Sequence, residues 1–312
     1  MSRQAILFPG QGSQYVGMAG AILERRPSCS FFLEEARRIL PFDVERLIRE
    51  GPPDLLSQDL PSQVATFVAN AIYWSLWKGK GQRPWAVTGY SLGFYSALMA
   101  AEVFDYSVGL SLIREAGRLM EEASSLRPGR MAAIIGLSEE EVLQICREVK
   151  GMGYVGLANL NASRQLVISG DQKAVEAASS LSLARGALEV KEIAANAAYH
   201  SPLMEEPARS FAKFLEEVPL KDPVLPVLSY ADAEYVRDKE RARQLLSLQL
   251  HSQVRWKDCM ERLVGEGVTT FVEVGPNQVL SRLIRWINRS VRAYATDDPE
   301  VLERILEGGD LE

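Results

Sequence analysis

The segment around Ser91 limits the possible folds more than any other part of this sequence. Residues 85–97 begin as an apolar, strand-like run, break at Gly89-Tyr-Ser-Leu-Gly93, and continue as a helix-like run. In such a strand, sharp turn and helix, called a nucleophile elbow, flanking glycines permit close backbone packing and the serine hydroxyl projects into a cleft. The pattern predicts an α/β fold and makes Ser91 a candidate nucleophile.

Composition narrows the class of protein. The chain has 312 residues, of which 47% are hydrophobic and 24% charged, enough for one large domain or a large domain with a smaller one. A net charge of −6 without a Lys/Arg block excludes a nucleic-acid binder. The apolar run at 65–77 is interrupted by Asn70 and Ser75, which predicts a buried helix and no membrane span. No signal peptide is recognisable, so we expect a cytoplasmic protein.

The three cysteines favour neither a disulfide framework nor a metal site. Cys29, Cys146 and Cys259 lie far apart in the chain, and no ligand spacing joins them. We therefore expect free thiols and no bound metal.

The order of the expected elements changes near residue 130. Before it, strands at 4–8 and 86–89 alternate with helices from about Tyr15 and at 62–78, which predicts a parallel sheet covered by helices. After it, the pattern gives strands and helices in the order βαββαβ, typical of a ferredoxin-like unit. These elements are expected at 131–135, 138–149, 154–160, 165–169, 171–185 and 187–193.

This change predicts a small domain inserted into a larger one. We expect residues 129–198 to form the ferredoxin-like domain, and residues 1–128 and 199–312 to form the large domain. The large domain would continue through strands at 224–228 and 270–274.

Histidine is the usual base for a serine nucleophile, and this chain has only two. His200 lies just after the last strand expected in the inserted unit, where the chain returns to the large domain. His251 has no such position, and we interpret it as a structural or surface histidine. His200 is therefore the candidate base.

A second glycine-rich loop follows the first expected strand. In Phe8-Pro-Gly-Gln-Gly-Ser-Gln14, glycines on both sides of Gln11 let the backbone approach a ligand. Loops at the carboxyl edge of a parallel sheet share one crevice, so this loop is expected to face Ser91. A tight structural turn explains the loop equally well.

Six segments together resemble the malonyl-CoA:acyl carrier protein transacylase family, which includes the acyltransferase domains of fatty acid and polyketide synthases. The resemblance runs nearly end to end, in order and at similar spacing. The segments are Phe8-Pro-Gly-Gln-Gly-Ser-Gln14, Gly89-Tyr-Ser-Leu-Gly93, Met131-Ala-Ala-Ile-Ile-Gly136, Asn159-Leu-Asn161, His200-Ser-Pro-Leu-Met204 and Val274-Gly-Pro-Asn277. It implies an α/β-hydrolase-like large domain with a parallel sheet and an inserted ferredoxin-like small domain.

The resemblance also implies a two-step acyl transfer. Ser91 would attack an acyl-CoA thioester, with His200 as base, and the phosphopantetheine thiol of an acyl carrier protein would then accept the acyl group. A backbone carbonyl near Ser252 would orient His200. The backbone N–H groups of Gln11 and Leu92 would form the oxyanion hole. No cofactor would be bound beyond these two thioester carriers.

The resemblance assigns further residues to substrate binding and shows one departure. Gln63 and Asn161 match residues near the substrate, although packing or turn formation explains them as well. Malonyl-loading members carry an arginine that pairs with the free carboxylate, and here Ala116 occupies that position. A malonyl carboxylate would then be unpaired, which costs several kcal/mol.

Aromatic residues surround the same expected pocket. Tyr90 precedes the serine, where the family commonly has histidine, Phe94 replaces a usual glutamate, and Tyr199 precedes His200. Together they predict a more apolar acyl pocket.

Three functions therefore stay open from the sequence. They are an acyl-CoA:carrier-protein transacylase for malonyl or a non-carboxylated acyl group, a hydrolase using the same Ser91 and His200, and a non-catalytic carrier-binding subunit. Acidic carriers need a basic patch, for which Arg282, Arg285 and Arg289 on the expected last long helix are candidates. A solvated helix face is the alternative explanation. We expect a monomer.

Overall fold

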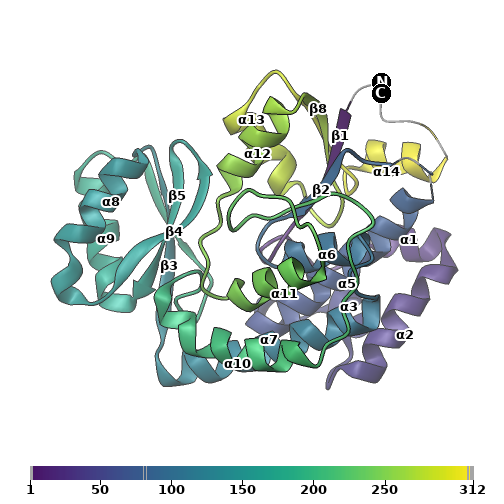
Figure 1. Cartoon of the computed structure of the whole chain (residues 1–312), viewed down its shortest axis with the longest axis horizontal. Helices are drawn as coiled ribbons and strands as arrows, with labels where there is room; N and C mark the ends of the chain where they lie inside the picture. The colour runs from purple at the N-terminus through teal and green to yellow at the C-terminus, as the bar shows by residue number, and fades with distance from the viewer. Residues whose placement is uncertain (1–2, 80, 82, 308, 310–312) are drawn as a thin grey trace.

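The chain is built around two β-sheets that lie in different parts of the molecule (Figure 1). The computed structural model describes residues 3–79, 81, 83–307 and 309. The larger sheet is parallel throughout and has the strand order β7-β2-β1-β8-β9. Its strands are β1 (Arg3–Phe8), β2 (Ala86–Gly89), β7 (Val227–Leu228), β8 (Val268–Glu273) and β9 (Arg292–Ala295). The expected parallel sheet is confirmed, and β9 extends it beyond the strands expected from the sequence.

Helices cover this sheet, as an apolar parallel sheet requires. The helices of this part, in the described residues, are α1 (Gly20–Arg25), α2 (Ser30–Ile39), α3 (Val44–Glu50), α4 (Pro53–Leu56), α5 (Asp59–Lys78), α6 (Gly93–Ala100), α7 (Tyr106–Leu126), α10 (Glu205–Glu216), α11 (Lys239–Leu248), α12 (Trp256–Gly265), α13 (Val279–Ile287) and α14 (Pro299–Leu306). Short 3-10 turns occur at Pro27–Cys29, Lys150–Met152 and Pro202–Met204. Helix α5 is buried along most of its length, as its apolar run predicted.

The helix expected from about Tyr15 begins only at Gly20. Gly17 and Ala19 have φ values of 93° and 60°, which are incompatible with a right-handed helix. Residues 15–19 therefore form turns, and the prediction for this helix start was wrong.

The second sheet is antiparallel with the order β4-β5-β3-β6. Its strands are β3 (Gly129–Ile135), β4 (Val155–Ala162), β5 (Gln165–Asp171) and β6 (Glu189–Ile193), and its helices are α8 (Glu139–Glu148) and α9 (Gln172–Ala184). This βαββαβ arrangement is the ferredoxin-like unit that the sequence predicted. Its apolar residues form a separate core that includes Ile134, Ile145 and Ile168. The exact limits of the two domains stay a prediction.

The small sheet contacts the large part through β4. Helices α8 and α9 lie on its outer side, away from the large part (Figure 1). The N–H of Leu160 donates to the carbonyl of Val254 at 2.8 Å, and the N–H of Val254 donates to the carbonyl of Ala158 at 2.8 Å. These bonds anchor the segment that precedes α12, two residues after Ser252.

Candidate functional site

Ser91 occupies the sharp turn between β2 and α6. Its φ is 50°, in the left-handed region that non-glycine residues rarely adopt. A Cβ on Gly93 would lie 2.1 Å from the carbonyl oxygen of Phe8, so only glycine permits this approach of the elbow to the end of β1. The structure thus has the strained strand-to-helix turn of a nucleophile elbow.

The hydroxyl of Ser91 contacts His200 directly. Ser91 Oγ and His200 Nε2 are 2.8 Å apart, and His200 Nδ1 is 2.8 Å from the carbonyl oxygen of Ser252. A carbonyl can only accept, so Nδ1 carries the proton and Nε2 is left free to accept from the serine hydroxyl. This arrangement is that of a serine hydroxyl and a base oriented by a third group.

Burial keeps His200 neutral. Removal from solvent lowers the pKa of the imidazole to about 4, although the hydrogen bond to the Ser252 carbonyl partly opposes this effect. The ring also packs edge-on against Tyr230, with 6.1 Å between ring centres. At neutral pH the side chain is therefore an unprotonated base.

The loop that follows β1 lies against the elbow. The N–H of Tyr90 donates to the carbonyl of Phe8 at 3.0 Å, and a Cβ on Gly10 would lie 2.3 Å from the Tyr90 carbonyl oxygen. Gln11 is the residue that directly follows Gly10. In the described part of the chain, the N–H groups of Gln11 and Leu92 donate no hydrogen bond to the protein. Two unused donors thus flank the serine.

The side chain of Gln11 points to a carboxylate. Its Nε2 donates to Asp59 Oδ1 at 3.2 Å, and Asn196 Nδ2 donates to Asp59 Oδ2 at 3.2 Å. Asp59 is buried at the start of α5. It joins the loop after β1 to the segment that leads into His200.

The aromatic residues expected near the site have different environments. The hydroxyl of Tyr90 donates to Asn161 Oδ1 at 2.7 Å and accepts from Asn159 Nδ2 at 2.6 Å. Burial raises the pKa of this hydroxyl to about 12, so it stays protonated. Phe94 is fully buried and packs edge-on against Tyr230. Tyr90 and Asn161 thus connect the elbow to β4 of the small sheet.

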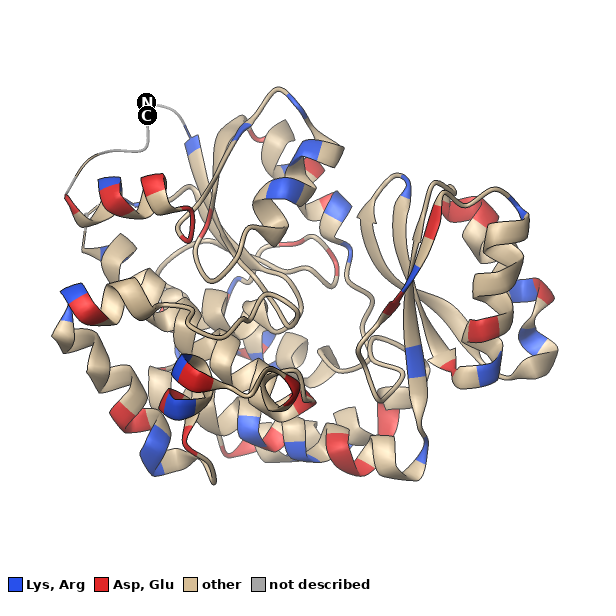
Figure 2. Ribbon diagram, turned by 180° about the vertical axis from the view of Figure 1, so that it is seen from behind, with Lys and Arg blue, Asp and Glu red and all other residues tan. Residues whose placement is uncertain are grey.

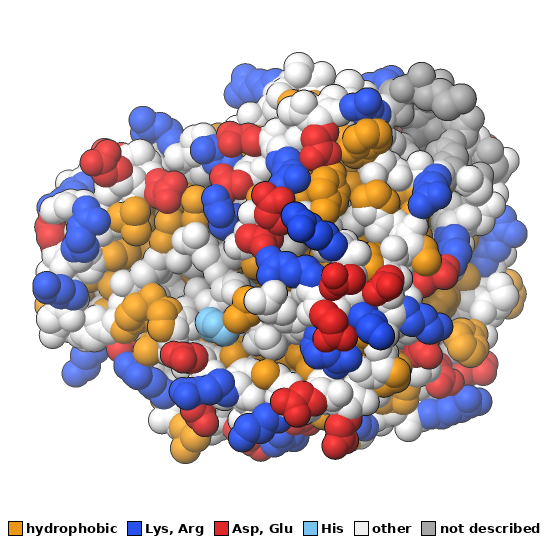
Figure 3. Space-filling model, viewed as in Figure 1, with side chains coloured by type: hydrophobic (Ala, Val, Ile, Leu, Met, Phe, Trp, Pro, Cys, Tyr) orange, Lys and Arg blue, Asp and Glu red, His pale blue; other side chains and the backbone are white. Residues whose placement is uncertain are grey.

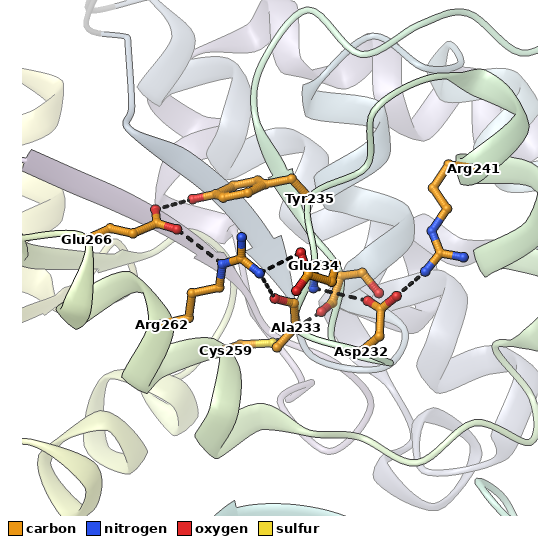
Figure 4. A network of polar contacts seen from close by, with 9 residues as sticks. Asp232, Ala233, Glu234, Tyr235, Arg241, Cys259, Arg262 and Glu266 are labelled. Atoms are coloured by element: carbon orange, nitrogen blue, oxygen red, sulfur yellow. Dashed lines mark hydrogen bonds and ion pairs between the residues drawn. The ribbon is translucent and has the colours of Figure 1, made fainter.

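A charged network holds the loop that carries Tyr230 (Figure 4). Arg262 of α12 pairs with Glu234 at 2.7 Å and donates to the carbonyl of Ala233 at 2.6 Å. Glu266 accepts from Arg262 Nε at 3.1 Å and from the Tyr235 hydroxyl at 2.5 Å. The network fixes the loop from which Tyr230 packs against His200.

Ala116 is buried on α7, on the side of this helix that faces α5. It lies one turn before Met120, whose sulfur accepts from Gln63 Nε2 at 3.5 Å. Ala116 itself is 1% exposed. Arg114 and Arg118 make other contacts, with the Ile39 carbonyl and with Glu115 and Glu122 respectively. Both guanidinium groups are thus held by other partners.

Arg282, Arg285 and Arg289 do not share one helix. Helix α13 ends at Ile287, so Arg289 lies in the turn beyond it, and this part of the prediction was wrong. Arg282 and Arg285 line a surface cavity of about 330 Å³ that Asp298 and Glu300 also line. Basic and acidic residues are interspersed on the surface helices (Figure 2). No purely basic patch results at this cavity.

Several residues at the site could not be identified from the sequence. Gln249 Nε2 donates to the carbonyl of Ser91 at 3.4 Å, the Tyr230 hydroxyl donates to the carbonyl of Gln249 at 3.3 Å, and Asn159 bonds Tyr90. The only indication in the sequence was that Gln249 lies three residues before Ser252, to which the resemblance assigned a role. Isolated polar residues that follow no periodicity carry no local sequence signal.

The described residues show no sign of a disulfide, a metal site or a membrane-spanning helix. The three cysteines are buried free thiols, and no cluster of three or more His, Cys, Asp or Glu side chains suited to a metal ion is found there. Within those residues, no helix has the length and apolarity needed to cross a bilayer. The surface is hollowed between the small-sheet part and the rest of the molecule, and a histidine side chain is visible in this hollow (Figure 3).

Comparison with known proteins gives the family of the chain. Residues 6–299 match the family model of the acyl transferase domain. A malonyl CoA-acyl carrier protein transacylase from Bacillus subtilis is 36% identical over 308 residues, which cover 98% of this chain and 97% of that protein. The protein of the same name from Escherichia coli K12 is 32% identical over 308 residues, covering 98% and 100%.

Solved structures give the same result. The malonyl-CoA:acyl carrier protein transacylase from Xanthomonas oryzae superposes with a TM-score of 0.94 at 34% identity, covering 99% of each chain. A malonyl-transacylase solved in complex with a type II polyketide synthase acyl-carrier protein also gives 0.94 at 34% identity, covering 99% of this chain and all of that one. The chain therefore belongs to the malonyl-CoA:acyl carrier protein transacylase family of acyltransferases.

Proposed function

We propose that this protein is an acyl-CoA:acyl carrier protein S-acyltransferase that works through an acyl-enzyme on Ser91. The single observation that carries the proposal is the 2.8 Å contact of Ser91 Oγ with an unprotonated His200 Nε2. His200 takes the serine proton as Oγ attacks the thioester carbon, and coenzyme A leaves as the thiol. The phosphopantetheine thiol of the carrier then attacks the ester, and Ser91 regains its proton.

The unused N–H groups of Gln11 and Leu92 support an oxyanion hole. Leu92 directly follows the serine, and Gln11 directly follows Gly10, which packs on the carbonyl of Tyr90. Both donors would stabilise the charge that develops on the thioester oxygen during attack. In comparable enzymes, the loss of one such donor raises the activation barrier by roughly 3 to 4 kcal/mol. The hydrogen bond of Gln249 to the Ser91 carbonyl helps to hold the elbow in place.

Ala116 favours a neutral acyl group as the substrate. The relatives, in contrast, are named for the malonyl group. The two nearest arginines in the sequence, Arg114 and Arg118, bond to the Ile39 carbonyl and to Glu115. Phe94, Tyr90 and Tyr199 add aromatic side chains. Gln63, Asn161 and these aromatics are proposed to contact the acyl group. A hydrolase with the same pair and a non-catalytic subunit are the alternative outcomes of the test below.

An acyl carrier protein is the proposed acceptor, as in the complex of the related malonyl-transacylase. Arg282 and Arg285 are the remaining candidates for docking it, since Arg289 lies apart in the next turn. The cytoplasmic location and the monomeric state expected from the sequence stay predictions.

The test compares three donors. The protein is incubated with acetyl-CoA, malonyl-CoA or a longer acyl-CoA, its intact mass is measured, and holo acyl carrier protein is then added. We expect an acetyl adduct on the enzyme that moves to the carrier, with less adduct from malonyl-CoA. Loss of the adduct to water with no acylated carrier would identify a hydrolase, and no adduct from any donor would identify a non-catalytic subunit.

The pH profile of acylation should report the depressed pKa of His200. Because its pKa in the folded protein is about 4, the base stays neutral from pH 8 down to about 5. We expect the rate of adduct formation from acetyl-CoA to be flat over this range and to fall below it. His251→Gln should give the same profile, which assigns the titration to His200. A midpoint near 6.5, the ordinary histidine value, contradicts the prediction.

A further inference from the structure

Asp59 is a buried carboxylate that the proposed acyl transfer does not use. It is 6% exposed and is the first residue of α5. Its two oxygens accept one hydrogen bond each, from Gln11 and from Asn196. Gln11 follows β1, and Asn196 lies four residues before His200, so Asp59 contacts two segments that lead to the candidate site.

A buried hydroxyl interacts with this carboxylate. Tyr199 is 6% exposed, and it directly precedes His200. Burial, the negative charge of Asp59 and a hydrogen bond with it raise the pKa of the Tyr199 hydroxyl. Asp59 therefore lies close to the residue next to the candidate base.

Asp59 also lies near Ala116. Helices α5 and α7 approach closely where Leu60 packs on Gly117, since a Cβ on Gly117 would lie 2.6 Å from Leu60 Cδ1. Asp59 and Ala116 are the sequence neighbours of this pair, so both lie at the same crossing of the two helices. Gln63, one turn after Asp59, contacts Met120, one turn after Ala116.

A malonyl carboxylate that entered beside Ala116 would therefore approach a second carboxylate. Two like charges that lie close together repel each other strongly when both are shielded from water. We propose that Asp59 is a second determinant of acyl specificity, which rejects carboxylated acyl groups and reserves the pocket for neutral acyl thioesters. This inference rests on the proposed acyl transfer from coenzyme A to Ser91.

The test measures the ratio of malonyl to acetyl adduct formed on Ser91 in Asp59→Asn. Repulsion between unit charges about 6 Å apart, at an effective dielectric constant of about 20, corresponds to about a hundredfold change in binding. With partial screening, we expect the ratio to rise about tenfold or more. Asp59→Glu keeps the charge and should keep the ratio of the unmodified protein. Asp54→Asn removes a charge from exposed α4 and should also leave the ratio unchanged.

The outcomes separate the inference from the function on which it rests. Equal losses of malonyl and acetyl loading, with an unchanged ratio, would mean that Asp59 only positions Gln11, and would overturn the inference. The absence of any adduct in the unmodified protein would overturn the proposed function and this inference together. Thermal unfolding checks that each variant folds, and Asp59→Ser replaces Asp59→Asn if the latter does not.

Discussion

Replacing Ser91 with alanine is expected to remove the acyl-enzyme and lower carrier acylation by about 10⁵-fold or more, as loss of the nucleophile does in other serine enzymes. The physical reason is that, among the described residues, Ser91 is the hydroxyl in contact with the free Nε2 of His200. His200→Ala should lower the rate to a similar extent, because nucleophile and base act as one unit. Intact mass and single-turnover acylation measure both effects.

Ser125→Ala provides the matched control, because Ser125 lies on the exposed face of α7. It should acylate at the rate of the unmodified protein. The thermal midpoint of Ser91→Ala should stay close to that of the unmodified protein, since the change removes one oxygen from a turn that stays intact. An adduct that persists in Ser91→Ala would contradict the assignment of the nucleophile.

Ala116→Arg should change the acyl preference of the enzyme. A guanidinium on this face of α7 can pair with a free carboxylate through two hydrogen bonds, which a neutral acyl group cannot use. We expect the ratio of malonyl to acetyl loading to rise about tenfold to a hundredfold, equivalent to about 1.4 to 2.7 kcal/mol. Parallel loading reactions followed by intact mass give this ratio.

Two further variants make the result interpretable. Ala116→Met adds volume without charge, so its ratio of malonyl to acetyl loading should not rise. If Ala116→Arg has the same ratio as the unmodified protein, residue 116 does not determine the acyl preference. Because Asp59 and Ala116 belong to the same crossing of α5 and α7, we expect Asp59 to pair with the introduced guanidinium and weaken the gain. The double variant Asp59→Asn with Ala116→Arg should therefore favour malonyl more than the sum of the single changes predicts.

Much of the fold could be predicted from the sequence. The strand at Ala86–Gly89 and the helix expected at 138–149 are read from contiguous residues, and the structure contains both. The βαββαβ order was likewise confirmed. The missed elements were those with weak or unusual local signals, including the short strand β9 and the delayed start of α1 after residues with positive φ.

The candidate site was predictable to the extent that it lies in motifs. Ser91, His200, Gln11 and the Ser252 carbonyl were expected to come together, and the 2.8 Å contacts of His200 with Ser91 and Ser252 agree with that expectation. Their roles stay predictions until the experiments above are done. The predicted basic patch did not form on one helix, because α13 ends at Ile287 and Arg289 lies beyond it.

The sequence determined the local chemistry of this protein, because a strand, a glycine-flanked turn and a helix are encoded by adjacent residues. The environment of that chemistry depends on tertiary structure. Asp59 contacts Asn196, which lies 137 residues away in the sequence, and Gln249 contacts the Ser91 carbonyl over a separation of 158 residues. Such contacts produce no periodicity in the chain, since they arise only when separate elements pack together. The candidate nucleophile could therefore be inferred from sequence, whereas the contacts of Asp59 with Gln11 and Asn196 appeared only in the folded molecule.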